Sequence, residues 1–259
     1  MLTRVIGKHL EDIIPVLQKH GFQLTTGAEE TPDLVVAHGG DGTLFEAERL
    51  FPGIPKLPLR DAGTAPLCAE HELNRQLEDF LAGKKKPAEL IKLEAVACDR
   101  VIKGINDIFL HHVQPGTALR YRVWIDDILY ANEVVGDGVG LATVHGSTAY
   151  YRSITSSIFR VGIGLAFNNS TEVVNHLVIS ENSVVRVKII RNDGVVVADN
   201  SPNPLELSEG EEFIMRKSSD KALVYGLDDF MCSKCRVLRH PSALAFRCIP
   251  VSELKKESR

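Results

Sequence analysis

Apolar residues near the N-terminus recur with the period of a helix. Leu10, Ile13 and Leu17 fall on one helical face, and Gly21 follows as a suitable stop. The uninterrupted apolar run at 34–37 is typical instead of a strand that is buried on both faces of a parallel sheet. The pattern therefore predicts an amphipathic helix followed by a buried strand.

The alternation of helix and strand continues beyond this point. Residues 39–43, which read GGDGT, come directly after the apolar run, and residues 44–51 have a helical pattern. Residues 54–60 predict a second strand and residues 73–81 a further helix. Strands that alternate with helices indicate an α/β unit. We therefore predict a Rossmann-like α/β domain with a parallel sheet over residues 1–86.

Strand patterns dominate the next part of the chain. Apolar and polar residues alternate at 91–97, 121–125 and 185–189, as they do in half-buried strands. Asn192-Asp193-Gly194 then predicts a hairpin turn into the apolar residues that follow.

These patterns define the domain organisation that we expect. One helix is predicted near Ser147–Ile154, within a mainly antiparallel, β-rich domain that covers residues 87–228. We expect residues 229–259 to form a C-terminal extension that packs back on the first domain.

Composition and charge narrow the class of partner. The 259 residues are 44% hydrophobic and 25% charged, with a net charge of −4. Proteins that bind nucleic acids or membrane surfaces usually carry a basic face, and the only basic run, Lys84-Lys85-Lys86, is interpreted as a solvated linker. No apolar run approaches the roughly 20 residues that span a bilayer, and no signal-peptide core is present. We predict a cytoplasmic protein without nucleic-acid or membrane partners.

The cysteines leave one alternative open. Five cysteines, an odd number, fit free thiols in a reducing compartment. Cys232 and Cys235 have the spacing of metal ligands, and with His240 and Cys248 they could hold a structural zinc ion. A second Cys-x-x-Cys pair is missing, so we favour ordinary thiols and predict no metal site.

The glycine-rich segment 39–43 is the most informative. Glycines allow the backbone to approach a phosphate, and the start of a helix favours negative charge. Asp41 in such a loop is suited to accept a proton from a hydroxyl or to face a metal ion. The alternative is an ordinary turn capped by an aspartate. No Gly-x-x-x-x-Gly-Lys-[Ser/Thr] segment is present, so we expect no separate P-loop.

Two further segments carry polar groups that suit a nucleotide. Asn106 and Asp107 interrupt a largely apolar run, which predicts a strand end or bulge there. Asn can recognise an adenine edge, and a carboxylate can accept hydrogen bonds from ribose hydroxyls. Gly136-Asp137-Gly138 is followed by the cluster 146–150, GSTAY, which could bind an adenine or a ribose. Turns of this composition are common, so each segment alone is weak evidence.

In their order along the chain these segments resemble the NAD kinase family. The likeness rests on GGDGT at 39–43, Asn106-Asp107 where the family has Asn-Glu, Gly136-Asp137-Gly138 and GSTAY at 146–150. The resemblance implies a two-domain fold and phosphoryl transfer to the adenosine-ribose 2′-hydroxyl of NAD, from ATP or polyphosphate with Mg²⁺. It implies Asp41 as the base, and as nucleotide-binding residues Gly40, Gly42, Thr43, Asn106, Asp107, Asp137, Thr148, Ala149 and Tyr150. It also implies a homodimer or homotetramer.

Some residues depart from the family pattern, so two alternative functions stay open. Thr143-Val144-His145 and Ser156-Ser157-Ile158 replace segments that flank the family's GSTAY block. The alternatives are a non-catalytic dinucleotide-binding regulator and a kinase of another hydroxyl substrate, such as a lipid. ATP and polyphosphate are the alternative phosphoryl donors, and NAD and NADH the alternative acceptors.

Overall fold

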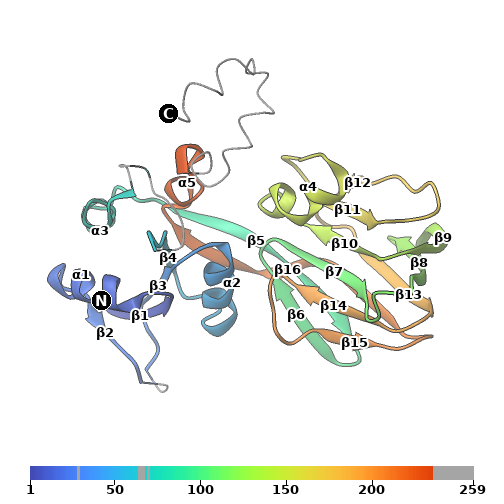
Figure 1. The fold of residues 1–259 in the computed structure, drawn as a ribbon, viewed down its shortest axis with the longest axis horizontal. Coiled ribbons are helices and arrows are strands. Elements are labelled where there is room, and N and C mark those ends of the chain that lie inside the picture. Colours follow the sequence, from blue (N-terminus) through green and yellow to red (C-terminus); the bar gives the residue numbers. More distant parts are fainter. Residues whose placement is uncertain (28–29, 64–67, 69–70, 236–259) are drawn as a thin grey trace, which may run out of the picture. The chain divides into compact units, whose positions relative to one another are not determined.

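The computed structural model describes residues 1–27, 30–63, 68 and 71–235, which group into two compact units (Figure 1). The first unit combines the described residues of Met1–Ala47 and Ile54–Ala88 with residues 223–235. The second unit combines Glu48–Gly53 with Glu89–Ala222.

The first unit is built on a parallel sheet with the strand order β2-β1-β3-β4. Val224, near the end of β16, adds to β4 in parallel. The elements are β1 (Leu2–Gly7), α1 (Leu10–Lys19), β2 (Gln23–Leu24), β3 (Leu34–His38), α2 (Asp41–Leu50), β4 (Lys56–Leu59), α3 (Leu73–Leu81) and α5 (Leu227–Phe230).

The core of this unit follows from the apolar pattern. Every residue of β3 is buried, as predicted for a central parallel strand. Helix α1 buries Ile13 and Leu17 against Val36 and Leu57. The predicted α/β domain is confirmed, and it holds the GGDGT segment between β3 and α2.

The second unit contains two largely antiparallel sheets. One has the order β16-β13-β8-β9, with β5 between β16 and β6, and the other the order β12-β11-β10-β7-β14-β15. The elements are β5 (Pro87–Ala97), β6 (Arg100–Gly104), β7 (Asp107–His112), β8 (Leu119–Ile125), β9 (Ile128–Gly136), β10 (Gly138–Ala142), η2 (Gly146–Thr148), α4 (Tyr150–Thr155), β11 (Ile163–Asn168), β12 (Leu177–Ile179), β13 (Val185–Arg191), β14 (Gly194–Ala198), β15 (Leu205–Leu207) and β16 (Glu212–Tyr225).

The two sheets of this unit share one apolar core. Alternate residues of β8, β13 and β14 are buried, so each of these strands turns one face inward. Val187 of one sheet and Leu110 of the other belong to the same cluster of buried side chains. The Tyr121 hydroxyl donates a hydrogen bond of 2.8 Å to the Gly138 carbonyl, which links the sheets through a polar contact. The predicted β-rich domain is confirmed.

The hairpin that we predicted at Asn192-Asp193-Gly194 is wrong. The chain does turn there, and Asn192 has a φ of 67°. However, β13 pairs with β8 and β16, whereas β14 pairs with β7 and β15. Both edges of β13 are occupied, so the chain crosses into the other sheet instead of folding back on its own strand.

The basic run is also not a simple solvated linker. Lys85 is buried, and its ammonium forms an ion pair with the Asp229 carboxylate. Within the part of the chain that the structure describes, no helix has both the length and the apolar character needed to cross a bilayer.

Candidate functional site

The GGDGT segment joins β3 to α2 in the first unit. Strand β3 ends at His38 and α2 begins at Asp41. A Cβ atom on Gly39 would lie 2.3 Å from the Thr43 hydroxyl oxygen, so a side chain at 39 would force this turn apart. Gly40, Gly42 and Thr43 therefore lie beside or within the first turn of α2, where the helix dipole favours anions.

The carboxylate of Asp41 is held by a buried cation. Nη2 of Arg60 donates a hydrogen bond of 3.1 Å to Oδ1 of Asp41. The Arg60 side chain is 8% exposed and the Asp41 side chain 51% exposed. The cation is thus fixed inside the unit, while the carboxylate remains open to a ligand.

Arg60 is itself fixed by the α5 segment. Its Nε and Nη2 donate to the Phe230 carbonyl over 3.1 and 3.0 Å, and its guanidinium carbon lies 3.7 Å from the centre of the Phe230 ring. Sequence reasoning missed Arg60. The available signal was its place directly after the buried strand β4, because the carboxyl ends of parallel strands are where α/β folds bind ligands.

The predicted break at Asn106 and Asp107 in the second unit is confirmed. Strand β6 ends at Gly104 and β7 begins at Asp107. The carboxylate of Asp199 accepts hydrogen bonds from the backbone N–H groups of Ile105 (2.7 Å), Asn106 (2.7 Å) and Asp107 (3.2 Å). Asp199 thereby shapes the loop and satisfies three of its backbone donors.

The GSTAY segment packs directly on this loop. A Cβ atom on Gly146 would lie 2.1 Å from the Asn106 carbonyl oxygen, so only glycine allows the two segments to approach this closely. Thr143 connects them, since its hydroxyl donates to the Ile105 carbonyl over 2.7 Å and accepts from the Gly146 N–H over 3.0 Å. Residues 146–148 form the short helix η2, and Tyr150 begins α4.

A cavity of about 340 Å³ opens where these segments meet. It is lined by Asp107, Phe109, His111, Tyr150, Val197 and Asp199. The rings of Phe109 and Tyr150 meet edge to face with their centres 4.8 Å apart. The cavity thus combines an aromatic wall with two carboxyl groups, which is a chemistry suited to a base and a sugar.

The charges of this cavity depend on pH. Burial, aided by the charge of Asp199, raises the pKa of Asp107 to about 7. Burial also raises the pKa of Asp199 to about 6, although its three backbone hydrogen bonds act in the opposite direction. The buried amide oxygen Oδ1 of Asn106 has no hydrogen-bond partner among the described residues. A ligand that donates to this oxygen would satisfy it.

Four predicted residues of the second unit do not line this cavity: Asn106, Asp137, Thr148 and Ala149. Oδ2 of Asp137 accepts a 2.6 Å hydrogen bond from the Asn169 amide, and its Oδ1 lies 3.5 Å from Nδ1 of His112. Thr148 is exposed at the end of η2 and Ala149 is half-buried.

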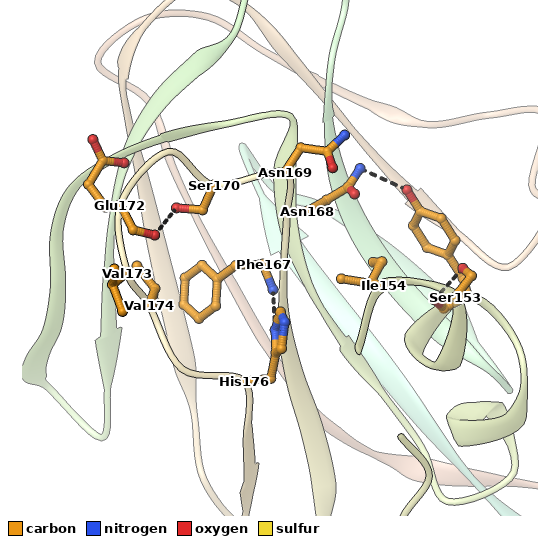
Figure 2. Close-up of a pocket in the computed structure, with 11 residues that line it drawn as sticks. Ser153, Ile154, Phe167, Asn168, Asn169, Ser170, Glu172, Val173, Val174 and His176 are labelled. Carbon is orange, nitrogen blue, oxygen red and sulfur yellow. Dashed lines mark hydrogen bonds between the residues drawn. The ribbon is translucent and has the colours of Figure 1, made fainter. Parts of the chain in front are cut away.

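A second, larger cavity of about 470 Å³ is also lined by Tyr150, together with residues such as Ser153, Asn168 and His176 (Figure 2). The Asn168 amide donates a hydrogen bond of 3.0 Å to the Tyr150 hydroxyl, and the Phe167 N–H donates to Nδ1 of His176 over 3.2 Å. Tyr150 is therefore common to both cavities. Sequence reasoning missed Asn168 and Asp199, although each is a polar residue at the end of a buried strand.

Two known proteins that match the sequence of this chain both carry the words NAD kinase in their names. No family model matches the chain. An NAD kinase of Methanothermobacter thermautotrophicus is 28% identical over 227 residues, which are 82% of this chain and 77% of that protein. A bifunctional NADP phosphatase/NAD kinase of Methanococcus maripaludis is 26% identical over 216 residues, 76% of this chain but only 37% of the longer relative.

Solved structures give the fold. An NAD kinase from Archaeoglobus fulgidus, solved in complex with ATP, is similar with a TM-score of 0.72 and 17% identity, covering 89% of this chain and 95% of that one. A yeast NADH kinase, complexed with NADH, gives a TM-score of 0.73 and 20% identity over 87% of this chain and 83% of that one.

The solved structures share the fold of this chain, an α/β unit with a β-rich unit, and the relatives that match it in sequence are named as kinases, a class of phosphotransferase. Within that class, the predicted resemblance to the NAD kinase family is confirmed.

Proposed function

We propose that the protein is an NAD kinase, which transfers a phosphoryl group to the 2′-hydroxyl of the adenosine ribose of NAD and yields NADP. One observation carries the proposal: Asp107 and Tyr150, from two of the predicted segments, line a single cavity that joins an aromatic wall and two carboxyl groups, and the neighbouring Asn106 has a buried amide oxygen without a hydrogen-bond partner among the described residues. Two relatives that are named NAD kinases match 76% and 82% of this chain, and they support the proposal.

We assign the parts of this cavity to adenosine. Oδ1 of Asn106 accepts from the exocyclic amine of the adenine, because it is a buried acceptor without a protein donor. The ionised carboxylate of Asp107 accepts from a ribose hydroxyl. Tyr150 supplies a ring against the base, flanked by Thr148 and Ala149. Asp137 is assigned to the other end of the dinucleotide.

The chemistry is assigned to Asp41. An alcohol is a weak nucleophile until a base removes its proton, and such a base contributes about 10²- to 10⁴-fold to the rate. Arg60 restrains Oδ1 of Asp41 and so directs the carboxylate, while the exposure of that carboxylate allows a hydroxyl to reach it. Gly40, Gly42 and Thr43 are assigned to phosphate contacts at the start of α2.

Mg²⁺ is assigned to the donor, as Mg²⁺·ATP or Mg²⁺·polyphosphate. Within the described residues, no group of three or more possible ligands surrounds Asp41. Magnesium prefers oxygen ligands, keeps several waters and is often bound through substrate phosphates. A single carboxylate is therefore sufficient as its protein ligand. When bound, the ion neutralises charge that develops on the transferred phosphoryl group.

The assay that tests this function uses the purified full-length chain. It is incubated with NAD or NADH, Mg²⁺ and either ATP or polyphosphate, and NADP(H) is detected through an NADP-specific dehydrogenase. We expect ATP-dependent formation of NADP. Tight NAD binding without turnover would instead identify a dinucleotide-binding regulator, and phosphorylation of a lipid but not of NAD would identify a kinase of another hydroxyl.

Several expectations from the sequence belong to the same proposal. These are a domain division at residues 1–86, 87–228 and 229–259, a cytoplasmic location and assembly into a homodimer or homotetramer. Size-exclusion chromatography with light scattering tests the assembly. Most of the C-terminal extension lies outside the described residues.

A further inference from the structure

Four possible metal ligands converge at one point of the first unit. They are Cys68 and His71, which follow β4, and Cys232 and Cys235, which follow α5. One ligand atom of each residue lies within 4.8 Å of the other three. Each pair has two residues between its members, which is the spacing with which a short turn presents two ligands to one ion.

The distances fit a tetrahedral site. Nδ1 of His71 lies 3.1 Å from the Cys68 sulfur and 3.4 Å from the Cys235 sulfur. In a tetrahedral zinc site with bonds of about 2.3 Å to sulfur and 2.0–2.1 Å to nitrogen, neighbouring ligand atoms lie roughly 3.5–3.8 Å apart. A shift of a few tenths of an ångström would bring His71 and these two sulfurs to such distances, and the remaining ligand pairs, all within 4.8 Å, would have to close by about 1 Å at most.

The second nitrogen of His71 is held as metal-binding histidines require. Nε2 of His71 is hydrogen-bonded to the backbone carbonyl of Asp229, so Nε2 carries the proton and Nδ1 presents its lone pair to the sulfurs. A ligand histidine nearly always donates its other N–H to a carbonyl or carboxylate, which fixes its ring and tautomer. His71 is buried, so this orientation is set by the fold and not by solvent.

Backbone N–H groups point to the sulfurs as well. The Cys68 N–H donates to the Cys235 sulfur over 3.3 Å. The backbone N–H groups of Lys234 and Cys235 donate hydrogen bonds to the Cys232 sulfur. Such donors stabilise thiolates, which are the form that binds a metal.

The geometry points to a structural Zn²⁺ site formed by Cys68, His71, Cys232 and Cys235. Three soft thiolates and one imidazole select zinc over magnesium or calcium, which prefer oxygen. Four protein ligands leave no open position for a substrate, so the site is structural and not catalytic. The sequence offered His240 and Cys248 as partners of the Cys232 pair, and both lie outside the described residues.

The site would fasten the α5 segment beside the Asp41 carboxylate. Asp229, which holds His71, is next to Phe230, and the Phe230 carbonyl accepts both hydrogen bonds from Arg60. Arg60 in turn donates to Asp41. Zinc at the four ligands would therefore keep α5 in place and, through it, the cation that orients the proposed base.

Metal analysis of the full-length protein tests the site without reference to activity. The chain is produced without a polyhistidine tag, purified under reducing conditions, and analysed by mass spectrometry of metals and by colorimetric zinc release with a mercurial. We expect one zinc ion per chain. Cys235→Ser and His71→Ala should lose the metal, whereas Cys98→Ser, which alters an exposed thiol of the second unit, should retain it.

Cobalt gives a second readout if the zinc variants fold poorly. Co²⁺ added to the wild-type apoprotein should produce intense tetrahedral and thiolate-to-metal bands, which zinc then removes. Less than about a tenth of an equivalent of zinc or cobalt after reconstitution would overturn the site. Alkylation and mass spectrometry that found a disulfide between these cysteines in the freshly isolated protein would also overturn it. Neither result depends on whether NAD is phosphorylated.

Discussion

Nη2 of Arg60 lies 3.1 Å from Oδ1 of Asp41, and the same nitrogen donates to the Phe230 carbonyl over 3.0 Å. One planar group thus connects an exposed carboxylate to the backbone of a segment far along the chain. Arginine suits this position because its fixed fork can donate in two directions and stack on a ring at the same time.

The proposed role of Asp41 predicts a loss of rate with little loss of stability. Asp41→Asn keeps the shape but cannot accept a proton, so kcat should fall about 10²- to 10⁴-fold. The melting temperature should hardly change, since the carboxylate is half exposed. Asp99→Asn, which removes an equal charge from an exposed turn, is the control. A near wild-type kcat for the Asp41 variant would remove it from the chemistry.

Arg60→Lys should lower kcat more than it raises the KM for NAD. A lysine retains the positive charge but cannot donate to both Asp41 and the Phe230 carbonyl while lying over the Phe230 ring. The loss of a charged hydrogen bond costs about 1.5–3 kcal/mol, or roughly ten- to 150-fold in rate if it acts only in the transition state. Arg75→Lys on the exposed face of α3 is the matched control. Equal changes in both variants would show that Arg60 positions nothing.

Two variants of Tyr150 distinguish a role in ligand binding from a role in packing. Tyr150→Ala should weaken NAD binding by roughly 1–3 kcal/mol if the ring stacks on the base. Tyr150→Phe keeps the ring and its edge-to-face contact with Phe109 but loses the hydroxyl that accepts from Asn168, so its affinity should stay close to that of the wild type. Calorimetric titration with NAD beside thermal unfolding measures both effects. A lowered melting temperature with unchanged affinity in the alanine variant would assign the ring to packing alone.

The raised pKa of Asp107 predicts a dependence of stability on pH. Between about pH 4, near the ordinary value of 3.8, and about pH 7, the folded protein keeps a proton that the unfolded chain has released. The contribution of this group to the free energy of unfolding therefore falls as the pH rises through that window and stays low above it. Asp107→Asn removes this titration. The free energy of unfolding of the variant, relative to that of the wild type, should therefore increase as the pH approaches neutrality. Urea unfolding across the window measures the difference, and parallel curves would refute the shift.

The same titration should control ligand affinity. The ionised carboxylate of Asp107 is a stronger acceptor for a ribose hydroxyl than the protonated acid, so the Kd for NAD should decrease as the pH rises through about 7. Asp107→Asn should bind more weakly and lose this dependence, while the KM for ATP changes little. An unaltered pH profile in the variant would mean that Asp107 only begins a strand.

The sequence predicted the local elements of the first unit well because burial alone defines them. A run such as 34–37 has no polar residue, and the sheet buries all of it. The break at Asn106 and Asp107 was predictable for the opposite reason, since polar residues resist a buried strand. In both cases the information lies within a few neighbouring residues.

Long-range partners were not predictable in this way. Asn192-Asp193-Gly194 specifies a turn, but which strand pairs with β13 depends on β8 and β16, which lie elsewhere in the chain. Asp199 reaches the loop at Asn106 only because β14 lies beside β7. Cys68 and Cys235 are likewise brought together by the fold and share no local pattern.

The pairing of Val224 with Lys56 has a consequence for the synthesis of this protein. The ribosome completes residues 89–222, which supply most of the second unit and both of its sheets, before Val224 emerges. During that time β4 presents an unpaired edge, a feature that invites association with other chains. Contacts between distant residues also close late, because a long loop must first be ordered. The parallel sheet of the first unit is therefore completed only after most of the second unit has been synthesised.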